Sequence, residues 1–372
     1  MGVAALTRVK LLHCADLHLD APFTSLSDST AAAETRRYEI KLAFRKIIAL
    51  AKEEAVDLLL VAGDLFEHGY VRKSTIHLLS DEFENIMDTQ VLIIPGNHDP
   101  VVTDSYYSNF TWPANVHIFT AMEQNFDLAS SCVSIYGSIP KTVPDRSRVN
   151  ILLLHGTVDM NPDGRAYNPY ASMELDALGM DYTALGHFHN CITGAGSQGR
   201  IFNPGSPEPL GFDEEGSHGV FIVEIEKSEG ISSVNSRFLP INSRSYRNVS
   251  VKLDECATDE QAAKKAEKAF EAGAAADLYC ITFQGTTAAG FRLNRNRVAG
   301  YLKDRAFYLK VKDDTFPEYD LDGIRNEPGL RGVFTGKMLD RAALAADEEE
   351  RSLIMQALYY GLEAIDRGEI HL

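Results

Sequence analysis

Residues 11–23, LLHCADLHLDAPF, begin as an apolar run and continue into a loop that carries Asp16, His18 and Asp20. Packing does not require two carboxylates and an imidazole directly after a buried strand. A single Asp-x-His spacing is weak evidence, because a chain of 372 residues contains such spacings by chance. The stretch becomes informative only if the same arrangement recurs elsewhere in the chain.

Short apolar runs that end at a glycine or a polar loop recur through the first 240 residues. Runs of this kind become buried central strands. Two amphipathic stretches separate the first three runs, with helical stripes from Ile40 to Ala51 and from Ile76 to Met87. The sequence therefore predicts an α/β layered sandwich, with central sheets flanked by helices. The runs are VKLLHCA (9–15), VDLLLVAG (56–63), QVLIIPG (90–96), VNILLLHG (149–156) and YTALGH (182–187), followed by the strand-rich RIFNPGS (200–206) and HGVFIVEIE (218–226).

The composition is that of an ordinary globular protein, with 45% hydrophobic and 24% charged residues. A net charge of −17 argues at face value against a polyanionic ligand. The charge is uneven, however, because residues 241–312 contain thirteen Lys and Arg but only eight Asp and Glu. This region is locally basic, and bound divalent cations would offset part of the negative charge elsewhere.

Five cysteines, an odd number without C-x-x-C spacing, fit a reducing cytoplasm better than a disulfide framework. Cys14, Cys132 and Cys280 lie in apolar runs, and we expect them to be small core residues. The first residues, MGVAALTRVK, lack a signal-peptide pattern, and the chain has no apolar run of membrane-spanning length. The sequence thus predicts a cytoplasmic protein that does not enter a membrane.

The pattern changes near residue 240. SYRNVSVKLD (245–254) is followed by the helical DEQAAKKAEKAFEAG (259–273) and by the strand-like LYCITFQG (278–285) and AFYLKVKDD (306–314). This order predicts a small β-α-β-β unit, and from about residue 330 onward the pattern is helical. We expect a catalytic domain over residues 1–240, a small α+β cap domain over 241–325 and a helical carboxyl-terminal segment over 326–372.

Loops after five of the predicted strands carry side chains that bind metals. In open α/β sheets the carboxyl ends of strands face one crevice, so loops far apart in the sequence converge there. Imidazole, carboxylate and amide oxygen bind divalent ions such as Mn²⁺, Fe²⁺, Zn²⁺ or Mg²⁺, and the lack of cysteine disfavours a structural zinc site. Two such ions can orient a phosphate and stabilise the attacking and leaving oxygens. The side chains are Asp16, His18, Asp64, Asn97, His98, Asp99, His155, His187 and His189.

The ordered motifs DLH (16–18), GDLF (63–66), GNHD (96–99), HG (155–156) and GHFH (186–189) resemble those of the calcineurin-like metallophosphoesterases. The longer stretches DLHLDAPF, GDLFE and NPGSPEP are similar to SbcD-type DNA repair exonucleases of the YhaO-like branch. This resemblance covers about residues 9–215. The region after it is similar to that family's DNA-binding cap in element order only.

The resemblance implies a site for two divalent metal ions, with Mn²⁺ the first choice and Mg²⁺, Fe²⁺ or Zn²⁺ the alternatives. Asp64 would bridge the ions. His98 would stay uncoordinated, similar to the family residue that gives a proton or hydrogen bond to the leaving oxygen, and Asp99 would orient it. The implied ligands are Asp16, His18, Asp64 and His189 for one ion, and Asp64, Asn97, His155 and His187 for the other.

Several other polar residues have less support for a role in the site. Asp20 either supports the metal ligands or is an exposed loop carboxylate. His13 lies within the first predicted strand, and we expect it to be a hydrogen-bonded core histidine. We assign no role to His68, His77, His117, His218 and His371.

The stretch FRLNRNRVAG (291–300) places Arg292, Arg295 and Arg297 near Phe291. Arginines beside an aromatic ring suit a nucleic-acid backbone and a stacked base, although a solvated charged surface fits them equally well. Further on, Ile354, Leu358, Leu362 and Ile365 form a helical stripe. The stripe either packs on its own domain or docks a partner. That partner would be an SbcC-like coiled-coil ATPase, which the resemblance implies, or a second copy of the chain.

We therefore expect a two-metal phosphodiesterase that hydrolyses DNA, as an exonuclease of repair or recombination. One alternative is a phosphodiesterase for a cyclic nucleotide or another small molecule. Another is a non-catalytic DNA-binding subunit with a vestigial site, which the complete set of implied ligands disfavours. A protein phosphatase is disfavoured because that group typically has Glu after the histidine of GNHD and an Asp-Arg-Gly continuation where this chain has GDLF.

Overall fold

The structure is a computed structural model that describes the chain except for residues 1–5, 123, 129–130, 161–166, 289–290 and 368–372. The chain divides into two compact units. The first consists of Met1–Arg247 with Ala276–Leu278, and the second of Asn248–Ala275 with Tyr279–Leu372. The roles expected for segments 1–240, 241–325 and 326–372 stay predictions.

Two six-stranded sheets form the first unit. In the first sheet β1 (Thr7–Cys14), β2 (Leu58–Ala62), β3 (Gln90–Ile94) and β4 (Val116–Ile118) are parallel neighbours, and β11 (Gly219–Ser228) and β12 (Ile231–Pro240) extend it beyond β1 in antiparallel order. The second sheet has the order β5 (Asn125–Leu128), β6 (Val133–Tyr136), β7 (Val149–His155), β8 (Tyr182–Gly186), β10 (Ile201–Asn203) and β9 (Ile192–Ala195). The apolar runs of the sequence thus become the central strands of both sheets.

The two sheets share one apolar core. Leu11 and Leu60 of the first sheet and Leu153 and Ala184 of the second are fully buried in the same cluster. Both faces of the central parallel strands are covered, which explains why these runs are continuously apolar rather than alternating. The predicted α/β layered sandwich is confirmed.

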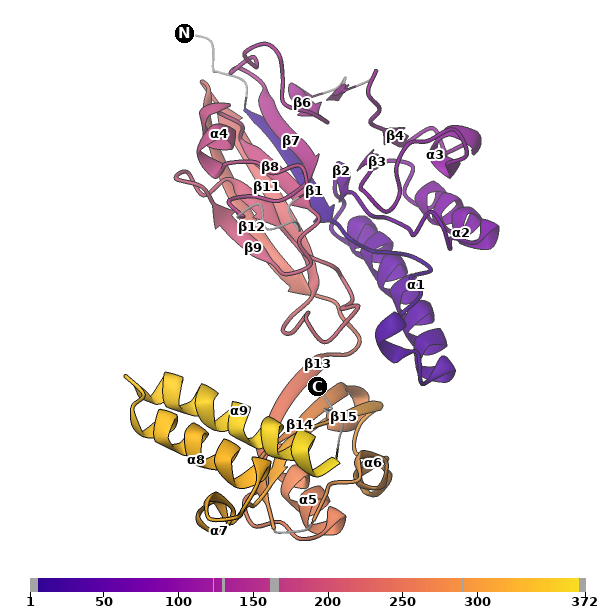
Figure 1. Cartoon of the computed structure of the whole chain (residues 1–372). Coiled ribbons are helices and arrows are strands. Elements are labelled where there is room, and N and C mark those ends of the chain that lie inside the picture. The colour runs from indigo at the N-terminus through magenta and orange to yellow at the C-terminus, as the bar shows by residue number, and fades with distance from the viewer. Residues whose placement is uncertain (1–5, 123, 129–130, 161–166, 289–290, 368–372) are drawn as a thin grey trace. The chain divides into compact units, whose positions relative to one another are not determined.

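Helices lie against the sheets, and Figure 1 shows α1 and α2 beside β1–β3. In α1 (Thr30–Glu53) the residues of the predicted stripe are buried, and the Ser29 side chain caps the first turn by accepting a hydrogen bond from Ala32 N–H. The predicted second stripe is wrong at Met87, because α2 (Lys73–Glu84) ends before it and its side chain is 49% exposed. The shorter helices of this unit are η1 (Thr24–Leu26), α3 (Tyr106–Asn109) and α4 (Ser172–Ala177).

The carboxyl ends of the central strands are joined by backbone hydrogen bonds. Beyond the β1–β2 pairing, Asp16 N–H donates to Gly63 O (3.1 Å) and His18 N–H donates to Asp64 O (2.9 Å). Gly186, at the end of β8, faces the first sheet so closely that a Cβ there would lie 1.8 Å from the Ala62 carbonyl oxygen. Glycine at this position lets the strand ends of the two sheets meet.

The second unit is built on the three-stranded sheet β13 (Tyr246–Lys252), β14 (Leu278–Thr287) and β15 (Tyr308–Pro317). The strands and α5 (Asp259–Ala266) follow the predicted order, and the short helices η2 (Glu267–Ala269) and η3 (Ala274–Ala276) follow α5. The predicted β-α-β-β order is wrong in one respect, because α6 (Arg295–Leu302) stands between β14 and β15. Asn294 starts this helix by accepting a hydrogen bond from Arg297 N–H (3.0 Å).

The chain ends in α7 (Leu321–Arg325), α8 (Leu330–Ala343) and α9 (Glu348–Arg367), and Figure 1 shows α8 and α9 side by side. The apolar stripe of α9 packs inside the second unit, with Leu358 and Leu362 fully buried beside Ile324 and Phe334. This is the first of the two alternatives expected for the stripe. The buried part of the stripe is thus covered within the unit, and the docking role of segment 326–372 stays a prediction.

The cysteines follow the prediction only in part. Cys14 and Cys280 are buried, but Cys132 is exposed and is therefore not a core residue. In the described residues all five cysteines are free. None of the described helices is both long and apolar enough to span a membrane. The cytoplasmic location stays a prediction.

His13 is a core histidine, as expected. Its ring is fully buried, and its two nitrogens lie 3.0 Å from the Tyr182 hydroxyl and 3.0 Å from the Leu185 carbonyl oxygen. Burial lowers its pKa to about 3, despite the opposing effect of the Leu185 carbonyl. At pH values between about 3 and 6.5, His13 therefore binds a proton in the unfolded chain but not in the folded chain.

The pKa difference predicts how His13→Gln changes the pH dependence of stability. In the wild type, protonation of His13 in the unfolded chain lowers the free energy of unfolding as the pH falls below 6.5, by up to about 1.4 kcal/mol per pH unit. The variant lacks this contribution, so its free energy of unfolding should fall less steeply with decreasing pH, by the same amount per pH unit. Denaturant unfolding between pH 7 and 4.5 in the presence of a chelator checks it, and parallel curves would contradict the assignment.

Candidate metal centre

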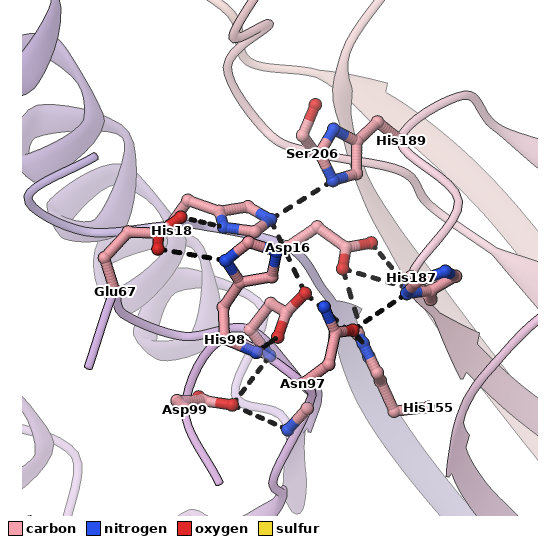
Figure 2. A network of polar contacts seen from close by, with 12 residues as sticks. Asp16, His18, Glu67, Asn97, His98, Asp99, His155, His187, His189 and Ser206 are labelled. Atoms are coloured by element: carbon pink, nitrogen blue, oxygen red, sulfur yellow. Dashed lines mark hydrogen bonds and ion pairs between the residues drawn. The ribbon is translucent and has the colours of Figure 1, made fainter. Parts of the chain in front are cut away.

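The side chains expected to bind metal converge at the carboxyl ends of strands from both sheets, as Figure 2 shows. Asp16 and His18 follow β1, Asp64 follows β2 and Asn97 follows β3. From the second sheet, His155 ends β7, and His187 and His189 follow β8. The fold thus brings together residues that span more than 170 positions of the chain.

Most of the ligand atoms form two adjoining groups. Asp16, His18 and His189 form one, and Asp64, His155 and His187 form the other; within each group the atoms lie within 4.8 Å of one another. Asp64 Oδ2 contacts both groups. It lies 3.3 Å from His155 Nε2 in its own group and 3.6 Å from His18 Nε2 in the other. A single carboxylate oxygen therefore lies between the two halves of the site, which is the arrangement expected of a bridging ligand.

In the first group, two imidazole nitrogens face each other. His18 Nδ1 donates to Glu67 Oε1 (2.8 Å), and His189 Nδ1 donates to Glu214 Oε1 (2.8 Å). With these protons on Nδ1, the Nε2 atoms of the two rings lie 3.1 Å apart and face each other. A proton shared between them or a metal ion bound by both satisfies this pair, so the donor set fits a metal ion.

The second group also directs imidazole nitrogens and oxygen donors into one small volume. His155 Nδ1 donates to the Ala62 carbonyl oxygen (2.8 Å), which leaves the Nε2 lone pair directed into the site. Asn97 Oδ1 lies 3.0 Å from that nitrogen and 3.0 Å from His187 Nδ1. The nitrogen and oxygen donors, with no cysteine among them, suit a borderline or hard divalent cation.

The carboxylates of Asp16 and Asp64 are buried beside histidine rings whose charge affects their pKa values. Asp16 and Asp64 are both at most 1% exposed. Burial raises the pKa of Asp64, but the hydrogen bond to His155 and the charges of His155 and His18 outweigh it and lower the pKa well below the usual range. Although burial opposes it, the nearby carboxylates raise the pKa of His155 to about 9. Positive charge, from protons or from metal ions, is therefore strongly favoured at this point.

The backbone at the site adopts conformations that non-glycine residues avoid. Asp16, His18, Asp64 and His187 have φ values of 52°, 47°, 50° and 96°. Such residues cost about 1–3 kcal/mol each and cluster at functional sites. Here the positive φ values bend the backbone directly after β1, β2 and β8, so that the side chains that follow these strands point into one small volume.

Glu67, not Asp99, orients His98. Glu67 Oε2 accepts a hydrogen bond from His98 Nδ1 (2.9 Å), while its Oε1 accepts from His18 Nδ1. The hydrogen bond to Glu67 raises the pKa of His98 although burial opposes it. Burial also raises the pKa of Glu67, but the hydrogen bonds to the two histidines outweigh it and lower the value to about 2. One carboxylate thus fixes a candidate metal ligand and the half-exposed His98.

The prediction that Asp99 orients His98 is wrong. Asp99 is fully buried and accepts hydrogen bonds from Gly96 N–H (2.6 Å), Leu65 N–H (2.7 Å) and the Tyr107 hydroxyl (2.6 Å). None of its hydrogen bonds in the described structure goes to the His98 ring. Asp99 instead ties the loop after β3 to the loop after β2, as Figure 2 shows in part.

Asp20 fits neither of its expected roles. It is 5% exposed and accepts hydrogen bonds from Thr75 Oγ1 (2.6 Å) and Arg72 N–H (3.0 Å), and it pairs with Lys41 Nζ at 2.7 Å. It therefore joins the loop after β1 to α1 and to the start of α2. The histidines without an assigned role lie outside the two ligand groups, and His371 lies outside the described residues.

Three residues that contact the ligands have no role predicted from the sequence. Glu67 and Glu214 hold the Nδ1 protons of His18 and His189. The Tyr167 ring packs 5.7 Å from the His155 ring and 5.2 Å from the His187 ring, measured between ring centroids. Glu67 stands within the quoted GDLFE motif and could have been found there. Glu214 and Tyr167 carry no local signal, because only the fold brings them to the site.

The expected DNA-binding arginines belong to the second unit. Arg292 Nη1 pairs with Glu363 (3.0 Å), and Arg297 Nη1 pairs with Asp259 (3.4 Å). Arg295 is exposed and lies at the start of α6. The structure thus separates three residues that the sequence groups together.

Residues 9–191 match the model of the calcineurin-like phosphoesterase family. Together with the two-sheet fold and the clustered Asp and His residues, this match defines a calcineurin-like metallophosphoesterase domain in this chain. Members of this family use a dinuclear metal site, and the two ligand groups described above can hold metal. Among the described residues, His18, Glu67 and His98 form a third such group, which shares His18 with the first.

Several curated proteins are similar to the chain. It is 30% identical over 243 residues to "Uncharacterized metallophosphoesterase YhaO" of Bacillus subtilis, with 60% of this chain and 59% of that protein covered. It is 28% identical over 270 residues to "DNA double-strand break repair protein Mre11" of Methanopyrus kandleri (59% and 54% covered). It is 25% identical over 273 residues to a component of the nuclease SbcCD of Staphylococcus epidermidis (63% and 70% covered). The chain thus spans less than two thirds of the first two relatives.

The shared position of Asp64 predicts a difference in metal content between two variants. Asp64→Ala should remove both metal ions, because one carboxylate serves both ligand groups. His98→Ala should retain them, because His98 belongs to neither ligand group: its Nδ1 is bonded to Glu67, and its ring only packs against the His18 ring. Elemental analysis after dialysis gives the metal content per chain. Two tightly held ions in the Asp64 variant, or none in the His98 variant, would refute these assignments.

The contact between Glu214 and His189 predicts a weaker effect of Glu214→Gln. Loss of the carboxylate that fixes the His189 proton should lower metal affinity by about 10- to 100-fold without abolishing binding. Calorimetric titration of the metal-free chain with Mn²⁺ measures this change. Glu174→Gln, at an exposed position of α4, is the matched control and should bind like the wild type. Equal affinities in all three proteins would contradict the role of Glu214.

Proposed function

We propose that the chain is a two-metal phosphodiesterase that hydrolyses DNA, as an exonuclease of repair or recombination. The observation that carries the proposal is the pair of ligand groups that meet at Asp64, with the half-exposed His98 beside them. A site that only stores metal has no need of an uncoordinated imidazole that a carboxylate holds beside the ligands. This arrangement suits the transfer of a phosphoryl group.

In this proposal Asp16, His18, Asp64 and His189 hold one ion, and Asp64, Asn97, His155 and His187 hold the other. The ions would be Mn²⁺, with Mg²⁺, Fe²⁺ or Zn²⁺ as alternatives. Bound divalent ions supply a nucleophile at neutral pH and neutralise charge on the phosphate. The chain itself positions them through Glu67, Glu214 and the Ala62 carbonyl, which fix the ring protons of three ligands.

His98 donates a hydrogen bond or a proton to the leaving oxygen in this mechanism. Its Nδ1 is bonded to Glu67, so Nε2 is the nitrogen that faces a substrate. Its side chain is 44% exposed, which gives the substrate access. The hydrogen bond to Glu67 raises the pKa of His98, although burial opposes this, and so favours the protonated, donating ring. Asp99 contributes indirectly, because it fixes the backbone of the loop that carries His98.

Support for DNA as the substrate comes from the relatives and from the second unit. One relative is named as a DNA double-strand break repair protein and another as part of a nuclease. Residues 241–312 carry an excess of basic residues in a chain of net charge −17. We propose that Arg292, Arg295 and Arg297 contribute to DNA binding. An SbcC-like ATPase or a second copy of the chain remains a proposed partner, but not through the buried stripe of α9.

A phosphodiesterase for a cyclic nucleotide or another small molecule is the alternative enzymatic function. The open neighbourhood of His98 admits small esters as well as polymers, so the geometry of the site does not separate the two. A non-catalytic DNA-binding subunit is the third function. The convergence of histidine nitrogens and carboxylates in the two ligand groups favours a working site over this one.

The proposal predicts Mn²⁺-dependent hydrolysis of DNA by the purified chain. Single-stranded and double-stranded DNA, a cyclic nucleotide and a phosphomonoester are compared at equal concentrations. DNA should be the best substrate, and His98→Ala should lower its turnover by about 10²–10⁴-fold, the range for a positioned acid. His77→Ala, at an exposed position of α2, is the control and should behave like the wild type. Preference for the cyclic nucleotide would favour the alternative, and no turnover of any substrate would favour the non-catalytic function.

A further inference from the structure

The second unit contains an open cavity of about 580 Å³ that lies apart from the ligand groups in sequence and in unit. It is lined by residues from the end of β14, the segment before α6, β15 and α9. Its wall includes the aromatic rings of Phe291, Phe316 and Tyr360 and the basic side chains of Arg295 and Lys312. The volume is within the range of about 300–1,000 Å³ typical of small-ligand sites.

The charges that line the cavity are not all equally available. Arg292 is paired with Glu363 at 3.0 Å. Asp313 accepts hydrogen bonds from the Thr315 hydroxyl (2.6 Å) and the Thr315 N–H (3.1 Å), which close a tight turn. Among the residues that the structure describes, Arg295 and Lys312 have no ion-pair partner, and both are exposed. They are free to receive an anion at the cavity, with Asp314 the remaining acidic side chain.

The rings of the cavity are partly exposed and held in place. The Phe316 ring lies 5.1 Å from the Tyr360 ring at 82° and 5.0 Å from the Tyr359 ring at 28°, measured between ring centroids. Two neighbouring rings of α9 therefore hold the Phe316 ring. The backbone of Phe291 is fixed by its N–H donating to Ala288 O (3.0 Å) and by its carbonyl accepting from Thr287 Oγ1 (3.0 Å). Fixed, partly exposed rings offer faces on which a flat aromatic ligand can stack.

We propose that this cavity binds one nucleotide, with the base against the rings and the phosphate on Arg295 and Lys312. The nucleotide belongs to a single-stranded DNA end or is a free nucleotide, since both present the same base and phosphate. The inference rests on the proposed function for the class of ligand, but its chemistry needs neither the metal ions nor hydrolysis. The inference gives a phosphate-binding role in the cavity to Arg295 but not to Arg297, because Arg297 pairs with Asp259 and does not line the cavity.

Binding is measured with the full chain in EDTA, so that the metal centre neither binds nor cleaves the probe. The probes are a labelled oligothymidylate, followed by fluorescence anisotropy, and thymidine monophosphate, followed by calorimetry. The double variant Arg295→Ala/Lys312→Ala should weaken binding by about tenfold or more and reduce its salt dependence, because phosphate contacts release counterions. Phe291→Ala should weaken binding by roughly 5- to 150-fold, the range for loss of one stacked base.

The matched control is Lys303→Ala/Lys310→Ala, which removes as many positive charges from the end of α6 and from β15, at exposed positions that do not line the cavity. It should bind both probes within about twofold of the wild type, and thermal unfolding confirms that every variant is folded. Binding of the oligonucleotide alone supports a DNA end as the ligand, and equal binding of the mononucleotide supports a free nucleotide.

The inference is overturned if the cavity variants bind like the wild type, if the control loses as much affinity, or if neither probe binds. These outcomes are independent of the Mn²⁺ assay. A chain that binds nucleotide in the cavity but hydrolyses nothing would refute the proposed function alone. A chain that hydrolyses DNA with unchanged binding by the cavity variants would refute this inference alone.

Discussion

The Ala62 carbonyl group is the point at which the two sheets of the first unit meet, and the ligand groups depend on it. It accepts the Nδ1 proton of His155 (2.8 Å), and it occupies the space that a side chain on Gly186 would need. Any residue larger than glycine at position 186 would push the end of β8 away from β2. The loops that carry Asp64 and His187 would then separate, although neither loop had changed. The geometry of the site therefore follows from a backbone contact between sheets.

Around that contact the fold concentrates hydrogen-bond acceptors in a buried volume. Buried carboxylates are usually matched by cationic side chains or metal ions. Here Glu67, Glu214 and the Ala62 carbonyl accept the Nδ1 protons, so the Nε2 nitrogens of His18, His189 and His155 face the buried carboxylates. The site therefore has an excess of acceptors that protons or metal ions offset. Because bound ions would relieve this excess only in the folded chain, they would also stabilise the fold.

The sequence predicts what depends on local pattern and misses what depends on tertiary contact. The central strands and the ligands that follow them are readable because apolar runs and their end points are local features. The family resemblance implies that Asp99 orients His98, but neighbouring residues of a turn direct their side chains to different partners, and Glu67 is the partner. The helix α6 was missed because only Val298 and Leu302 of its residues are buried, too few to produce a visible stripe. An apolar stripe such as that of α9 has the same sequence pattern whether it packs within its own unit or on a partner. The sequence therefore does not reveal that Leu358 and Leu362 are buried within the second unit.

The left-handed backbone at Asp16, His18, Asp64 and His187 places evolution of this site under two opposing pressures. Glycine at any of these positions would relax the backbone and, by itself, would make the folded loop easier to form. It would also remove a ligand atom. Selection for thermal stability alone should therefore enrich glycine at the very positions that selection for activity retains as Asp or His. The strain at these four residues is a measure of how much stability the chain gives up for its candidate metal centre.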